Sequence, residues 1–149
     1  MGSTDSRLLQ DEAAIRRLAA LYARAVDRNE PETMAGLFAA DAVLEGPGFV
    51  MRGREELRAI PGMLSGMYSR TLHQVHQQTV RVDGDSAAAE TYCTANHVTD
   101  KGGGAAENLV WAMRYLDQLR REDGRWVFSK RSVVIDWTET RVAQIPPAA

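Results

Sequence analysis

Hydrophobic and polar residues follow two different periods along the chain, and the period changes near residue 70. From residue 6 to about residue 27, apolar side chains recur at steps of three and four residues. They are Leu8, Ile15, Leu18, Tyr22 and Val26. This period predicts one amphipathic helix with a single buried stripe.

Short elements are expected between this helix and residue 70. Pro31 suits the first turn of a second helix over residues 31–38, and residues 41–46 (DAVLEG) indicate a short strand. Residues 53–68 have helical character, and Pro61 with Gly62 is expected to bend or split that helix.

After Arg70 the pattern is that of strands. Leu109, Trp111, Met113 and Tyr115 alternate with more polar neighbours, which is the period of a strand. Four such segments, separated by turn signals, are 71–82, 86–99, 108–121 and 125–137. Helices followed by a meander of strands predict an α+β fold. A curved antiparallel sheet is expected to wrap around the N-terminal helices as a cone that admits a small molecule.

Composition narrows the class of protein. The 149 residues fit a single domain (1–149), with a core of about 7–138 and an irregular tail, AQIPPAA. A net charge of −2 with scattered basic residues gives no electrostatic reason to expect nucleic acid or membrane partners. The single cysteine, Cys93, excludes an internal disulfide. The first residues lack signal-peptide character, so a cytoplasmic location is expected.

The long strands also predict self-association. Val110, Val133, Ile135 and Trp137 are expected to form an apolar surface that a small monomer would not usually leave in contact with water. A homo-oligomer is therefore expected.

The three histidines are the first candidates for chemistry. His73 and His76 are three apart, so on one strand they point to opposite faces and cannot bind one ion together. His97 follows the hairpin glycine Gly84 by 13 residues and His73 precedes it by 11, so these two are expected to be near neighbours across the sheet. Periodicity alone does not choose between His73 and His76, and a lone strand histidine is more often a packing residue.

Asp27 closes the first helix, where its negative charge opposes the helix dipole. With His73 and His97 it has the composition of a metal site, but no local ligand spacing supports one, and no metal is expected. Tyr22 lies five residues earlier on the apolar stripe, where its hydroxyl could reach a cavity beneath the helix, although a core tyrosine is the commoner outcome.

Three more polar residues lie on the predicted strands. Arg131 shares a strand face with Val127 and Val133, and a solvated arginine is the commoner outcome there. Glu90 and Asp117 are expected at the surface.

These elements together resemble the SnoaL-like branch of the nuclear transport factor 2-like superfamily over residues 7–138. Relatives of this branch include scytalone dehydratase, hexachlorocyclohexane dehydrochlorinase and bile acid 7α-dehydratase. The EDGRW and VDGD turns occur across the superfamily and say little about activity. More specific is the aspartate that ends the first helix, together with a histidine 11 residues before the hairpin glycine.

The resemblance implies roles for five residues. Asp27 and His73 match the family's Asp–His dyad, and Arg131 follows FSK as the dehydrochlorinase arginine does. Tyr22 matches a tyrosine of the bile acid enzyme, and His97 matches the second active-site histidine of scytalone dehydratase.

Other positions separate this chain from its relatives. Met113 and Tyr115 stand where scytalone dehydratase uses serine and asparagine, which argues against scytalone as the substrate. His76 matches no functional position, so His73 is the predicted base.

The resulting hypothesis is a cofactor-independent lyase, most simply a dehydratase of a cyclic, largely apolar small molecule. A buried carboxylate that holds one imidazole nitrogen leaves the other free to act as a base. An isomerase, a polyketide-type cyclase or a non-catalytic binding module remain alternatives. The dehydratase relatives imply a trimer, and other branches imply a dimer. The residues expected to line the cavity are Leu18, Tyr22, Val26, Phe38, Leu109, Trp111, Met113 and Tyr115.

Overall fold

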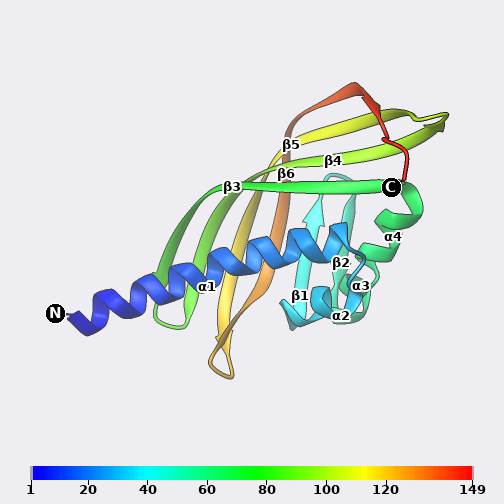
Figure 1. Cartoon of the computed structure of the whole chain (residues 1–149). Coiled ribbons are helices and arrows are strands. Elements are labelled where there is room, and N and C mark those ends of the chain that lie inside the picture. The colour runs from blue at the N-terminus through cyan, green and yellow to red at the C-terminus, as the bar shows by residue number, and fades with distance from the viewer. Residues whose placement is uncertain (1, 149) are drawn as a thin grey trace.

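A computed structural model describes residues 2–148 as four helices and six strands (Figure 1). The helices are α1 (Gly2–Asp27), α2 (Pro31–Gly36), α3 (Gly53–Arg58) and α4 (Ile60–Met67). The strands are β1 (Phe38–Gly46), β2 (Phe49–Arg52), β3 (Arg70–Asp83), β4 (Ser86–Gly102), β5 (Ala105–Glu122) and β6 (Arg125–Gln144).

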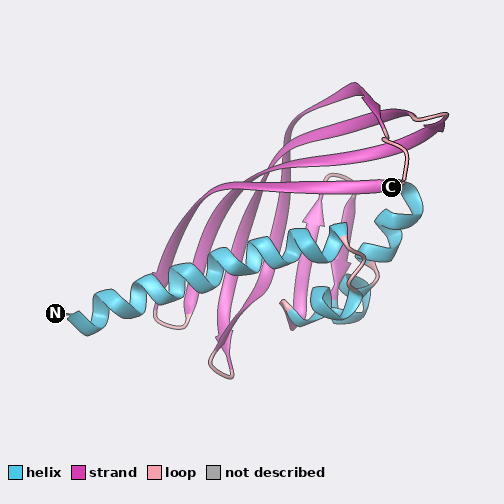
Figure 2. Cartoon of the chain, viewed as in Figure 1, coloured by secondary structure: helices cyan, strands magenta, loops and turns pink. Residues whose placement is uncertain are grey.

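The six strands form one sheet in the order β2-β1-β6-β5-β4-β3. The sheet curves over α1, which crosses one face, while α2, α3 and α4 gather near one end (Figure 2). The pairs β1–β2, β3–β4, β4–β5 and β5–β6 are antiparallel, whereas β1 pairs with β6 in parallel. The α+β prediction is confirmed. The sheet is mixed and not wholly antiparallel, because its last strand, β6, runs parallel to β1.

The core lies between α1 and the concave face of the sheet. Of the predicted stripe, Ile15, Tyr22 and Val26 are buried, whereas Leu8 is exposed. The inward positions of β4 from Ala87 to Ala95 carry small side chains, most of which belong to the same core. These buried small residues are Ala87, Ala89, Thr91, Cys93 and Ala95.

The helical stretch of residues 53–68 is split, but not where it was expected. The break falls at Ala59, and Pro61 lies in the first turn of α4. Proline is tolerated there because the first amides of a helix have no intrahelical acceptor. The predicted irregular tail also begins later, since Ala143 and Gln144 still belong to β6.

The prediction of an apolar surface for self-association is wrong for three of the four residues named. Val110 is buried, and Val133 and Ile135 pack against the core, so only Trp137 is largely exposed. The strand pattern alone could not assign these residues to the correct face. Self-association therefore stays a prediction. Among residues 2–148, no helix has the length and apolar character needed to cross a bilayer.

Candidate active site

Asp27 ends α1 beside the first residues of β3 and accepts three hydrogen bonds from that strand. Its Oδ1 accepts from Thr71 Oγ1 at 2.9 Å, and its Oδ2 accepts from the backbone nitrogen of His73 at 2.8 Å. The third contact joins Oδ1 to His73 Nδ1 at 2.7 Å. These bonds offset the unfavourable position of a carboxylate at the end of a helix.

The same contacts keep Asp27 ionised. Burial acts to raise the pKa of Asp27, but the hydrogen bonds from His73 and Thr71, together with the charge of His73, hold it below its ordinary value. A carboxylate accepts hydrogen bonds and does not donate, so Nδ1 of His73 carries a proton, and in the neutral ring Nε2 has a free lone pair.

The other strand histidine points away from this site. His76 is exposed, and its Nε2 contacts Thr94 Oγ1 at 2.7 Å. The His73 side chain is only 5% exposed. The prediction that the two histidines point to opposite faces therefore agrees with the structure.

His97 lies diagonally across from His73. The register pairs His73 with Ala95 and His97 with Thr71, and the two imidazole rings meet edge-on with centroids 5.9 Å apart. Tyr68 and Trp111 pack on His97, with ring centroids 4.8 and 4.7 Å from it. The predicted proximity of His73 and His97 is present.

Both histidines line an apolar cavity of about 370 Å³, a volume in the range of small-molecule sites. Four expected residues, Tyr22, Trp111, Met113 and Tyr115, line it as well. Burial raises the pKa of Tyr22 to about 12, so its hydroxyl keeps its proton and can donate. The remaining lining residues are Leu44, Phe49, Met51, Ile60, Met63, Leu64, Met67 and Val133.

Four predicted lining residues are not in the cavity wall. Phe38 is fully buried against Tyr22 and Phe128, and Val26 belongs to the core under α1. Leu18 packs against that core one turn before Tyr22. Leu109 is absent from the wall, although its carbonyl binds His97. The apolar stripe of a helix is wide enough to cover both the core and the cavity. The helical period alone therefore could not show which stripe residues pack in the core and which line the cavity.

Arg131, which the resemblance placed among the site residues, is also absent from the cavity wall. It is 0% exposed, and its Nε and Nη2 donate to the two oxygens of Asp117 at 2.8 Å each. Its guanidinium carbon lies 4.4 Å from the ring centroid of Tyr22 and 3.9 Å from that of Tyr115. Asp117 is therefore buried and not a surface residue, while Glu90 is half-buried and faces Arg114.

Sequence reasoning missed the outer part of the cavity, which β1, β2 and α4 supply. The signal was the run IPGMLSGM, where apolar residues recur on a short helix with little polar content. Thr71 was missed too, although it lies two residues before His73 and so on the same strand face.

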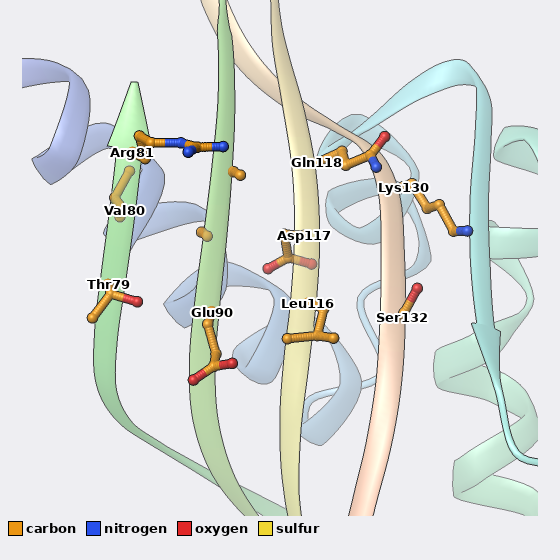
Figure 3. Close-up of a pocket in the computed structure, with 11 residues that line it drawn as sticks. Thr79, Val80, Arg81, Glu90, Leu116, Asp117, Gln118, Lys130 and Ser132 are labelled. Atoms are coloured by element: carbon orange, nitrogen blue, oxygen red, sulfur yellow. The ribbon is translucent and has the colours of Figure 1, made fainter. Parts of the chain in front are cut away.

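A second hollow, of about 550 Å³, lies on the outer face of the sheet across β3 to β6 (Figure 3). Three of its four charged side chains are paired with neighbours: Lys130 contacts Glu45 at 2.7 Å, Glu90 contacts Arg114 at 3.5 Å, and Asp117 contacts Arg131. It contains no histidine, so we place the candidate chemistry in the inner cavity. Among residues 2–148, no group of three or more His, Cys, Asp or Glu side chains could hold a metal ion.

A family model for the SnoaL-like domain matches residues 7–132. The chain belongs to the SnoaL-like domain family. This match confirms the resemblance carried by the Asp–His spacing and by the order of the elements. A search of curated proteins found no match.

Solved structures share the fold over most of their length. A protein of unknown function from Mycobacterium tuberculosis, solved as an aspartate-to-asparagine variant, is 28% identical with a TM-score of 0.79, covering 91% of this chain and 77% of its own. A proposed scytalone dehydratase from Novosphingobium aromaticivorans is 24% identical with a TM-score of 0.78, covering 98% and 99%. A type 2 hexachlorocyclohexane dehydrochlorinase is 22% identical with a TM-score of 0.86, covering 97% and 99%.

Proposed function

We propose that this protein is a cofactor-independent lyase of the dehydratase type that acts on a cyclic, largely apolar small molecule. The observation that carries the proposal is the 2.7 Å contact between Asp27 and His73 at the wall of the apolar cavity. The SnoaL-like family and the dehydratase and dehydrochlorinase names of two similar structures support it.

The first step is removal of a proton from a carbon next to a carbonyl group. His73 donates Nδ1–H to Asp27, so Nε2 takes the proton and the electron pair moves to the carbonyl oxygen as an enolate. The Asp27 carboxylate stabilises the imidazolium that forms. A positioned base of this kind contributes about 10²–10⁴ in rate.

The enolate oxygen needs a donor, and the tyrosines of the wall can supply one. Burial raises the pKa of both Tyr22 and Tyr115, so their hydroxyls stay protonated at neutral pH. The enolate then expels the hydroxyl on the neighbouring carbon. That hydroxyl leaves as water with the proton held by His73, which returns the histidine to its neutral form.

A bicyclic β-hydroxy ketone tests the reaction directly. Water loss from 3-hydroxy-1-tetralone gives 1-naphthol, whose fluorescence reports turnover. We expect naphthol to form with wild-type protein and not with His73→Ala. Absence of naphthol in the presence of wild-type protein would contradict dehydration of such substrates.

The alternatives give different results with 1-tetralone, which has no leaving group. Protein-dependent exchange of its α-hydrogens in deuterated water, without elimination from the hydroxy ketone, would point to an isomerase or cyclase. Binding without exchange or elimination would point to a non-catalytic module.

A further inference from the structure

His97 lines the cavity with one of its two nitrogens already bonded. Its Nδ1 lies 3.1 Å from the backbone carbonyl oxygen of Leu109. A carbonyl oxygen can only accept a hydrogen bond, so Nδ1 carries the proton. In the neutral ring, Nε2 then has a lone pair and no proton, and it can only accept.

The surroundings of His97 keep the ring in this form. The residue is 2% exposed, and its ring packs between Tyr68 and Trp111. Burial lowers the pKa of His97, because an apolar environment disfavours the imidazolium. In this form His97 has no proton at Nε2 to give to a leaving group.

The cavity therefore presents two imidazole acceptors at one end. His73 also has its Nδ1 bonded, to Asp27, and among residues 2–148 no hydrogen bond involves Nε2 of either ring. The two ring centroids are 5.9 Å apart, so a ligand in the cavity can lie beside both rings.

No positive side chain lines the cavity to receive an anion. The lining residues include no Lys or Arg, and Arg131 lies behind the wall with two of its nitrogens bonded to Asp117. Behind His73 lies the negative charge of Asp27. A carboxylate or phosphate placed here would lose its hydration and gain no counter-charge.

We propose that the site takes an uncharged, largely apolar ring compound whose hydroxyl group donates a hydrogen bond to Nε2 of His97, and that it excludes anionic forms of the same skeleton. The proposal rests on the proposed function and specifies its substrate class. In the elimination, the hydroxyl keeps its own hydrogen bond to His97 while His73 returns the abstracted proton to the same oxygen. The C–O bond then breaks, its electron pair stays on the oxygen, and water leaves.

Three bicyclic probes that cannot eliminate water test this without turnover. They are 2-naphthol, 2-methoxynaphthalene, which has no hydroxyl, and 2-naphthoate, which is anionic at neutral pH. By calorimetry we expect 2-naphthol to bind about five- to tenfold more tightly than 2-methoxynaphthalene, the worth of one neutral hydrogen bond. We expect 2-naphthoate to bind at least about a hundredfold more weakly than 2-naphthol. Equal binding of 2-naphthoate, or no binding of the two neutral probes, would overturn the proposal.

Variants assign the hydroxyl to one ring. His97→Leu and His97→Phe should bind the two neutral probes equally, and His97→Gln, whose side-chain carbonyl can accept, should keep part of the preference. His73→Leu should keep all of it. A preference that survives both apolar variants at His97, or disappears in His73→Leu, would overturn the assignment. The expected selectivity without naphthol formation from 3-hydroxy-1-tetralone would reject the dehydratase and leave the ligand class standing.

Discussion

Asp27, which is half-buried, and Asp117, which is buried, each contact a basic side chain, and their surroundings differ. Asp27 meets His73 at 2.7 Å beside the cavity, and Asp117 meets Arg131 through two bonds of 2.8 Å in the core. The Asp27 side chain keeps 16% exposure, whereas those of Asp117 and Arg131 have none.

The difference lies in the basic partner and its access to the cavity. A histidine has a second nitrogen that can gain and lose a proton near neutral pH, whereas an arginine stays charged. Arg131 instead packs against the rings of Tyr22, Tyr115 and Phe128 and so supports the cavity wall from behind. In the proposed function, similar contact distances therefore serve proton transfer in one place and packing in the other.

The largest expected effect comes from breaking the Asp27–His73 pair. His73→Ala and Asp27→Asn should each lower turnover of 3-hydroxy-1-tetralone by about 10²–10⁴-fold, because the base or its orienting group is lost. His76→Ala is the matched control and should be close to wild type, since His76 is exposed on the other face. Circular dichroism melts should show folded protein in all three. Variants that lose thermal stability but keep activity would make the pair structural.

Breaking the Asp117–Arg131 pair should act on stability. Arg131→Met leaves a buried carboxylate without a partner and should cost about 3–5 kcal/mol in the free energy of unfolding, measured in urea. The double variant Asp117→Leu with Arg131→Met should recover most of this loss, because no unpaired charge remains. If Arg131→Met were as stable as wild type, the Asp117–Arg131 pair would not have the structural role assigned to it here.

The pH dependence of the unfolding free energy tests whether the ionised form of Asp27 stabilises the fold. Its pKa is lowered in the folded protein, from an ordinary value of 3.8. The ionised Asp27 therefore stabilises the fold above about pH 4, and this contribution is lost as the pH falls through the folded value. The difference in unfolding free energy between wild type and Asp27→Asn should shrink in acid. A difference that stays constant with pH would show that it does not depend on ionisation.

The smallest effect is expected at the surface, where Arg114 donates to both oxygens of Asp136 at 2.9 Å. This geometry nearly repeats that of Arg131, but water and salt screen the pair. Asp136→Ala should barely move the urea midpoint, and added salt should remove even that change. A loss comparable to that of Arg131→Met would mean that burial is not what separates the two arginines.

The strand period predicted most of the fold. The four long segments and the first helix are present, and counting from Gly84 placed His73 near His97. The parallel pairing of β1 with β6 was not predicted, because it joins segments that no local pattern connects.

For the site, strand parity predicted that His73 and His76 lie on opposite faces but not how deep a residue lies. The resemblance placed Arg131 among the site residues, and its side chain is buried but bonds to Asp117. The sequence contained the clue: Asp117 and Arg131 lie seven residues before and after Gly124, and they pair across that hairpin. The division between core and cavity depends on how α4 and β2 close over the sheet, which is a tertiary effect.

The parallel pairing of β1 with β6 has a consequence for the order of folding. Glu45 on β1 meets Ser132 on β6 at 3.0 Å across 87 positions of sequence. On the ribosome, β1 and β2 emerge early and can pair with each other, but the other edge of β1 must wait for nearly the whole chain before β6 exists. Contacts of such long range are slow to form because loop-closure entropy is lost before they contribute. The cavity that uses residues of β1, β2 and β6 is therefore completed only at the end of synthesis, and β1 is the segment most exposed to mispairing until then.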